Sequence, residues 1–165
     1  MPLAQEEARC KRHYNALCLA YETLEQASAG LRNSLAPALS QTASYYMGVA
    51  TEGKYTTIGV GDHLALEYRA SEPGAANHPT GYLSAGTQDL AYISLRLALI
   101  RHLYAVAPTI VFDETFARLD DTRMRAMMRI LSQCAMDGMQ VILLSSQRRE
   151  AQILSQIAGF AYVQI

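Results

Sequence analysis

Two short apolar runs between helical segments constrain the fold of this chain more than any other feature. The runs are Ile110-Val-Phe112 and Val141-Ile-Leu-Leu144, and neither alternates apolar with polar residues. Unbroken runs of this length are typical of strands that are buried on both faces of a parallel sheet. We expect strands at 109–113 and 140–145, each followed by a helix. The sequence therefore predicts an α/β domain with a parallel sheet at its core.

The other expected elements follow from helical periodicity, strand-forming residues and turn residues. Pro37 predicts a break or kink near Ala36 in a long helical segment that starts near residue 5 and ends near residue 47. Further helices are expected at 87–105, 122–136 and 148–157. An antiparallel hairpin is expected from strands at 54–60 and 64–69 with a turn at 61–63, followed by a surface loop at 70–81 and, at the end of the chain, a strand at 160–165.

The first helical segment carries a short heptad pattern. One heptad position is occupied by Tyr14, Tyr21, Ser28 and Leu35, and another by Leu17, Leu24 and Leu31. This spacing indicates a coiled-coil seam of about three heptads; the alternative is an amphipathic helix packed on its own domain. We expect residues 1–36 to be the root of a coiled coil and residues 37–165 to be the α/β lobe. Because the coil begins abruptly, we also expect the chain to be a fragment.

Composition excludes several classes of protein. The chain has 165 residues and a net charge of −1, so it lacks the overall positive charge of many nucleic-acid-binding domains. It shows no signal peptide and no membrane-spanning run, and we expect a cytoplasmic protein. The odd number of cysteines, without metal-binding spacing, indicates idle thiols at Cys10, Cys18 and Cys134. We interpret the local basic group as a solvated helix face: Arg123, Arg125 and Arg129.

Two carboxylates end the first apolar run. Asp113 and Glu114 follow Phe112, and ligands of open α/β sheets bind beyond the carboxyl ends of the strands. A charged pair is costly to bury there unless it meets a cation or another partner. The functional interpretation is that Asp113 holds Mg²⁺ through water, and that Glu114 orients and deprotonates an attacking water. The alternative is an ordinary strand end with two solvated acids.

The segment Leu83-Ser-Ala-Gly-Thr87 precedes the helix expected at 87–105. Ser84 is a candidate N-cap, and Gly86 would allow the backbone to approach a ligand closely. The free N–H groups of the first helical turn favour an anion such as phosphate. We therefore assign Ser84, Gly86 and Thr87 to phosphate binding, with a plain capped helix start as the alternative.

Polar residues also follow the second apolar run and open the helix after the first. Asp120 or Asp121 is the expected N-cap of the helix at 122–136, and Asp120 is also compatible with a role at an interface. Ser145-Ser-Gln147 ends the second strand, which we expect to neighbour the first in parallel. Gln147 can donate a hydrogen bond to a phosphate but cannot carry the charge of a histidine.

One stretch imitates a phosphate-binding loop. Gly48 to Tyr55 nearly matches G-x-x-x-x-G-K-[ST], with Tyr55 where Ser or Thr is required. Such a loop follows a strand and opens a helix. This stretch follows a helical segment and opens a strand, and we reject it as a phosphate loop.

Taken in order, these motifs resemble the C-terminal half of an ABC-type ATPase head. The signature-like segment 83–99, the Walker B motif 110–114, the D-loop 117–120 and the switch segment 141–147 are most similar to those of SMC-like and SbcC-like coiled-coil ATPases of DNA repair and chromosome maintenance. The resemblance implies a P-loop NTPase fold with an added hairpin and a coiled-coil root. It also implies that the Walker A loop belongs to an N-terminal half-head.

The resemblance implies a role for each candidate residue. Ser84 and Gly86 would contact the γ-phosphate of an ATP held by the other subunit, and Asp120 would cross the dimer interface. Asp113 would serve Mg²⁺, Glu114 would be the catalytic base, and Gln147 would stand in place of the switch histidine, with Ser146 as the alternative under a one-residue shift. The resemblance also implies ATP and Mg²⁺ as cofactors, and as partners the Walker A half of the same protein and a second copy in a homodimer that encloses ATP. DNA and a nuclease subunit are further candidate partners, and no membrane is expected.

The chain departs from the family pattern at three positions. Ala85 replaces a common glycine, Thr115 stands where proline often follows Asp-Glu, and Gln147 replaces the histidine. We expect ATP hydrolysis only in the complete head, with the chain alone inactive. Three alternatives stay open: a non-hydrolysing half-head that docks a protein or DNA, a transporter-type nucleotide-binding subunit, and an unrelated α/β binding domain.

Overall fold

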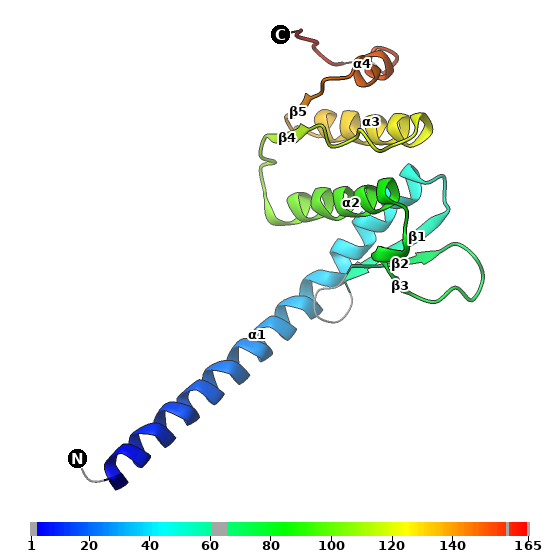
Figure 1. The fold of residues 1–165 in the computed structure, drawn as a ribbon. Helices are drawn as coiled ribbons and strands as arrows, with labels where there is room; N and C mark the ends of the chain where they lie inside the picture. Colours follow the sequence, from blue (N-terminus) through cyan, green and yellow to red (C-terminus); the bar gives the residue numbers. More distant parts are fainter. Residues whose placement is uncertain (1–2, 61–65, 158, 165) are drawn as a thin grey trace. The chain divides into compact units, whose positions relative to one another are not determined.

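The computed structural model describes residues 3–60, 66–157 and 159–164. The chain forms two compact units, residues 1–37 and 38–165, and the helix α1 (Leu3–Ala50) belongs to both (Figure 1). Of the break or kink expected near Ala36, the break is wrong, because α1 runs through Pro37 without interruption; the kink stays a prediction. Proline removes one hydrogen bond of the helical ladder, and the bonds of the flanking turns keep the helix continuous.

The N-terminal unit is a helix with large apolar side chains in water. Four large apolar residues of the seam are exposed, namely Tyr14, Leu17, Tyr21 and Leu24, whereas Leu35 is partly buried. The side chain of Leu31, which the heptad pattern includes, lies outside the described set. Exposed apolar side chains at this spacing are compatible with a coiled-coil partner. The role of residues 1–36 as a coiled-coil root stays a prediction.

In the larger unit, the end of α1 packs on an antiparallel sheet. Side chains spaced by three or four residues are buried: Leu39, Ala43, Tyr46, Met47 and Ala50. The Ser44 hydroxyl accepts the N–H of Ile58 at 2.9 Å and joins the helix to β1 (Tyr55–Val60). β1 pairs antiparallel with β2 (Leu66–Ala70), as the sequence predicted. The turn predicted at 61–63 lies outside the described residues.

The loop expected at 70–81 contains more regular structure than predicted. Its second part forms β3 (His78–Pro79), which pairs antiparallel with β2, and the 3-10 helix η2 (Thr80–Tyr82). A proline is tolerated here because β3 is the outer strand of the order β1-β2-β3. The prolines that indicated a loop therefore belong to a very short edge strand.

The stretch that imitates a phosphate loop forms the end of α1 and the turn after it. The Gly53 N–H donates to the Gly48 carbonyl at 2.8 Å, and the Thr51 hydroxyl donates to the Met47 carbonyl at 2.7 Å. These bonds satisfy carbonyls of the last helical turn. The segment closes a helix and opens β1, which confirms its rejection as a phosphate-binding loop.

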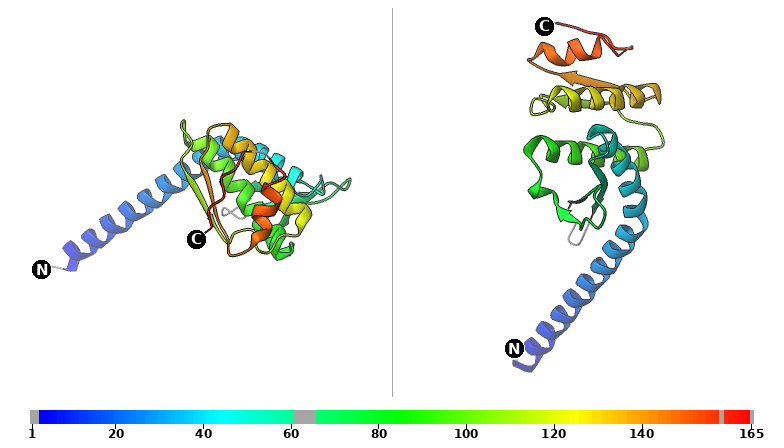
Figure 2. Two further views of the ribbon diagram at one scale, coloured as in Figure 1. Left: turned by 90° about the horizontal axis from the view of Figure 1, so that it is seen from above. Right: turned by 90° about the vertical axis from the view of Figure 1, so that its right-hand side faces the viewer.

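The second half of the chain alternates helices and strands as predicted. The elements are α2 (Ala85–Leu103), β4 (Ile110–Asp113), α3 (Asp121–Met136), β5 (Val141–Leu144) and α4 (Arg148–Leu154). β4 and β5 pair in parallel, with Asp113 opposite Leu144. Figures 1 and 2 show α2 and α3 side by side, and Arg101 of α2 forms an ion pair with Asp137 at the end of α3.

α3 buries one face and leaves the other in water. Its buried side chains include Met124, Met127, Met128, Leu131 and Cys134. This spacing places them on one side of the helix. The opposite side carries exposed residues such as Arg125 and Arg129.

Two expectations for the strands are wrong. The parallel strands are not buried on both faces, because Val111, Ile142 and Leu144 are 54%, 38% and 46% exposed. These apolar side chains lie on a face of the strands that the described part of the chain leaves uncovered. Residues 160–164 form no strand, because β-forming side chains make a strand only where a neighbour completes the hydrogen-bond ladder. Residue 165 lies outside the described residues.

No helix in the described part of the chain is long and apolar enough to cross a membrane. The three cysteines are free thiols: Cys10 is exposed, Cys18 is partly exposed and Cys134 is buried. The buried thiol lies 3.8 Å from the Tyr46 hydroxyl and joins α1 to α3. These thiols therefore form no disulfide that would stabilise the fold.

Candidate active site

The carboxyl ends of β4 and β5 meet at one edge of the parallel pair. The Glu114 N–H donates to the Leu144 carbonyl at 2.9 Å and continues the ladder beyond Asp113. Glu114 then turns the chain with a φ of 48°, in the left-handed region that few non-glycine residues adopt. After this turn the Glu114 carboxylate accepts the N–H of Ser146. The two motifs predicted to lie side by side are therefore in contact.

Hydrogen bonding sets the charge of Glu114. The N–H of Ser146 stabilises the ionised form and lowers the pKa of the Glu114 carboxyl below its ordinary value, and burial opposes this only weakly. The group is therefore an ionised proton acceptor at neutral pH. It is also exposed, so a water molecule can reach it.

Asp113 presents a second carboxylate at the same edge. It is exposed, and the Thr115 hydroxyl donates to its backbone carbonyl at 3.2 Å. Among the described residues, no group of three or more His, Cys, Asp or Glu side chains could hold a metal ion by itself. Mg²⁺ usually keeps several waters and binds one or two carboxylates together with substrate phosphates. The exposed Asp113 carboxylate could therefore supply one ligand to a Mg²⁺ whose other ligands come from water and a substrate.

The switch segment contacts Glu114 through its backbone. Gln147 is the N-cap residue of α4, yet its side chain makes no capping bond. Its N–H donates to the Ser145 hydroxyl at 3.0 Å, and the residue is exposed. The switch segment thus contacts Glu114 through the backbone N–H of Ser146, a group that any residue except proline would supply at this position. A role for the Gln147 side chain stays a prediction.

The turn before α2 uses its hydroxyl groups in an unexpected way. Ser84 is the N-cap residue of α2, as predicted, but its side chain does not cap a backbone N–H. Its hydroxyl lies 2.7 Å from the Thr87 hydroxyl. Ser84 is exposed, whereas Thr87 is only 1% exposed. Of these two hydroxyl-bearing side chains, Ser84 is the one presented to solvent.

Gly86 allows a close approach, but the approaching group belongs to the chain itself. A Cβ atom at this position would lie 2.6 Å from the Arg118 carbonyl oxygen. The Arg118 guanidinium also donates to both carboxylate oxygens of Asp89, at 2.8 and 2.5 Å. The sequence argument expected a ligand at Gly86; the structure places the segment 116–120 there. The turn at the start of α2 and the segment 116–120 are therefore in direct contact.

Asp120 is the N-cap residue of α3, and its carboxylate accepts the Arg123 N–H at 2.9 Å. This confirms one of the two predicted caps. Arg123 is not a solvated helix residue as expected, because its guanidinium donates to the Thr87 hydroxyl at 3.0 Å. Arg149 of α4 donates to the Phe116 carbonyl at 3.3 Å. Sequence reasoning missed these arginine contacts because the partners are about thirty residues apart, with no local signal.

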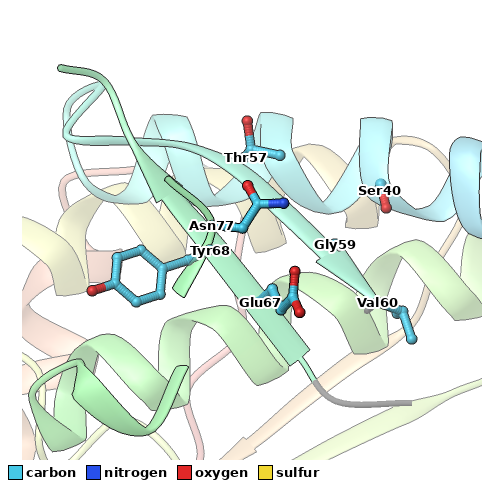
Figure 3. Close-up of a pocket in the computed structure, with 7 residues that line it drawn as sticks. All are labelled: Ser40, Thr57, Gly59, Val60, Glu67, Tyr68 and Asn77. Carbon is cyan, nitrogen blue, oxygen red and sulfur yellow. The ribbon is translucent and has the colours of Figure 1, made fainter. Parts of the chain in front are cut away.

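A separate shallow hollow of about 250 Å³ lies between α1 and the antiparallel sheet (Figure 3). Its lining includes Ser40, Thr57, Glu67 and Asn77. None of the sequence-predicted site residues contributes to it. The candidate site is therefore the edge at β4 and β5 and the turn before α2, rather than this hollow.

Comparison with known proteins identifies the fold. Residues 60–133 match the family model described as SbcC/RAD50-like, Walker B motif, a segment that includes Ser84, Asp113 and Glu114. The fold is that of an SMC-like ATPase head. This confirms the fold class that the motifs indicated, and the match of the Walker B segment supports the family resemblance. No curated protein sequence is significantly similar to the chain.

Solved SMC heads share this fold over most of the chain. An SMC ATPase described for ATP-driven dimerisation and DNA-stimulated activation superposes with a TM-score of 0.57 and 17% identity, covering 71% of this chain and 72% of that one. The Smc head with an extended coiled coil from Pyrococcus furiosus, bound to the C-terminal domain of ScpA, gives 0.55 and 18%, covering 87% and 40%. The SMC head from Thermotoga maritima gives 0.53 and 19%, covering 70% and 40%. The chain thus spans two fifths of the length of these last two.

Proposed function

We propose that this chain is the C-terminal half of an SMC-like ATPase head, which binds and hydrolyses ATP at a two-fold dimer interface once a Walker A half completes it. The observation that carries the proposal is the edge formed by Asp113, Glu114 and Ser146. It combines an exposed strand-end carboxylate with an ionised, hydrogen-bonded one beside it. The family match to the Walker B segment covers both carboxylates.

Each candidate residue has a role in this proposal. Asp113 would hold Mg²⁺ through water, and Glu114 would orient the attacking water and accept its proton. Ser84 and the first turn of α2 would contact the γ-phosphate bound by the other subunit, and Asp120 would lie near the dimer interface. Bound Mg-ATP would supply the transferable phosphoryl group and a divalent cation that neutralises developing negative charge. Because the two subunits exchange identical surfaces, the interface would be reciprocal.

The uncovered face of the parallel sheet also supports a half-head. Val111, Ile142 and Leu144 are apolar and exposed, although such strands are normally covered on both sides. The half that carries the Walker A loop would bury this face. The proposal thus explains both the apolar pattern of the strands and the rejection of residues 48–55 as a phosphate loop.

We infer the biological setting from the resemblance and from the similar proteins. One of them is described for ATP-driven dimerisation and DNA-stimulated activation. We extend both properties to the complete protein, acting in DNA repair or chromosome maintenance, with a nuclease subunit as a candidate partner. Adding double-stranded DNA to the complete protein should raise its ATP turnover, and an unchanged rate over a range of DNA lengths would contradict this part.

Replacing Glu114 tests the central role. In the complete protein, Glu114→Gln keeps the size of the side chain but removes its ability to accept a proton. We expect ATP turnover to fall by about a hundredfold or more, while ATP binding persists and the ATP-bound dimer accumulates. Phosphate release measures ATP turnover, and sedimentation velocity measures dimerisation.

The matched control is Glu72→Gln, which changes an exposed glutamate in the loop after β2. It should leave both measurements unchanged. Undiminished turnover in Glu114→Gln would remove Glu114 from the mechanism.

A non-hydrolysing docking module is the second candidate. It is favoured by the uncharged, exposed Gln147 in place of a histidine. The same turnover assay separates the two, because a docking module would bind Mg-ATP or DNA in the complete protein without releasing phosphate.

A further inference from the structure

A buried hydroxyl lies between an arginine and the exposed Ser84. The Thr87 hydroxyl accepts an N–H of Arg123 at 3.0 Å and lies 2.7 Å from the Ser84 hydroxyl. Thr87 is 1% exposed, so its hydroxyl is screened from solvent. Ser84, Thr87 and Arg123 therefore form a short relay that runs from α3 to the surface of the turn before α2.

The chemistry of the three groups sets the direction of this relay. A guanidinium is only a donor, so Thr87 must accept from Arg123. If Ser84 also donated to Thr87, the Thr87 proton would need another acceptor, and no other partner of that hydroxyl is found in the described residues. A buried donor without a partner is costly. Thr87 therefore donates to Ser84, which leaves the Ser84 proton free.

Asp120 holds the arginine at the start of this relay. Its carboxylate lies 3.4 Å from the Arg123 guanidinium and also accepts the Arg123 backbone N–H at 2.9 Å. The ion pair holds the guanidinium, and the backbone bond caps α3. The relay connects the cap of α3 to the hydroxyl of Ser84.

We propose that Arg123 and Thr87 are positioning residues that orient the Ser84 hydroxyl as a hydrogen-bond donor toward the γ-phosphate of an ATP bound by the opposite subunit. Neither residue touches that phosphate through its side chain. The inference rests on the proposed function. It reassigns Thr87 from ligand binding to orientation, and it gives Arg123 a role that its place among surface arginines did not suggest.

Substitutions that alter one member of the relay at a time test it. Thr87→Val keeps the shape but removes the hydroxyl, whereas Thr87→Ser restores it. Arg123→Gln shortens the donor and removes its charge. Arg129→Gln is the matched control, because Arg129 is an exposed arginine on the same helix.

The measurement is ATP-dependent dimerisation of the complete protein in the Glu114→Gln background, followed by sedimentation velocity. Thr87→Val and Arg123→Gln should each weaken dimerisation by about tenfold, the scale of one misaligned hydrogen bond. Thr87→Ser should restore it and Arg129→Gln should not change it. Binding of Mg-ATP to the isolated head at low protein concentration should be unaffected, because Ser84 acts across the interface.

A double-mutant cycle separates orientation from mere support of the fold. If Thr87 acts through Ser84, then Thr87→Val should add nothing to the effect of Ser84→Ala. Additive losses, or a loss that follows only the thermal stability of the variants, would overturn the proposal. If Thr87→Val fails to fold, the cycle with Arg123→Gln and Ser84→Ala gives the same decision.

The outcomes also distinguish this inference from the proposed function. No ATP-dependent dimer of the parent protein, or a Ser84→Ala variant that dimerises normally, would contradict the proposed function itself. A dimer that depends on Ser84 but not on Thr87 and Arg123 would contradict the relay alone.

Discussion

At the scale of single residues, Glu114 combines an unfavourable backbone conformation with the chemistry of the site. A left-handed φ costs a residue with a side chain about 1–2 kcal/mol, and Glu114 adopts a φ of 48°. Its N–H bonds to Leu144 and its carboxylate to Ser146. These bonds hold the conformation, as is common for strained residues at functional sites.

The bond from Ser146 predicts a measurable shift in the titration of Glu114. Because the folded-state pKa is lowered, the ionised carboxylate stabilises the fold at pH values above the unfolded-state pKa. This contribution is lost as the pH falls through the lower folded-state pKa. NMR titration of the Glu114 carboxyl should give a lower midpoint in the native chain than in urea. Equal midpoints would show that the bond is absent in solution.

Gly86 predicts a steric effect on stability. In Gly86→Ala the new methyl group would meet the Arg118 carbonyl at 2.6 Å, and overpacking of this kind costs about 1–3 kcal/mol. Urea unfolding should show the loss. Gly81→Ala is the control, because nothing lies within 4 Å of a Cβ there; an equal effect at both positions would contradict the steric explanation.

At the scale of elements, β4 and β5 have one buried and one exposed apolar face. Phe112 is 5% exposed and packs on Phe116 with ring centroids 5.2 Å apart, whereas Val111 is 54% exposed. Adjacent strand residues point to opposite faces. Phe112 and Val111 therefore lie on opposite faces of β4, one buried and one exposed.

This difference predicts unequal effects of substitution in the chain alone. Phe112→Ala should lower the free energy of unfolding by about 3–5 kcal/mol, and Val111→Thr should change it by about 0.5 kcal/mol or less. Urea denaturation measures both. In the complete head Val111→Thr should become clearly destabilising, because the proposed partner half would bury that face. A similar small effect in both contexts would argue against this covering.

At the scale of the whole molecule, the chain supplies the strand-end carboxylates and the turn before α2 but lacks a loop that cradles phosphate among its described residues. The nearest candidate, residues 48–55, ends α1 and begins β1. Its N–H groups are not gathered at a helix N-terminus, the arrangement that binds phosphate.

The chain by itself should therefore show no detectable binding of Mg-ATP in calorimetry. The complete head, which includes the Walker A half, should bind under the same conditions. Tight binding to the chain alone would mean that it holds the triphosphate by a route other than the proposed half-site.

The motifs and the order of elements could be predicted from the sequence, because they depend on local patterns. Apolar runs predicted β4 and β5, and Asp120 predicted the cap of α3, since capping involves residues only three apart. The fold was predicted from the resemblance of the ordered motifs to SMC-like heads. The two strands of the hairpin were predicted from their β-branched and aromatic side chains, which is also a local pattern.

Only the tertiary structure decided how these motifs contact one another. The approach of Arg118 to Gly86, the bond from Arg123 to Thr87 and the bond from Ser146 to Glu114 join residues about thirty positions apart. It also decided that the apolar runs have an uncovered face and that residues 160–164 form no strand. The physical reason is that burial and strand pairing depend on which neighbours are present in space, and a local pattern records only the preference for having them.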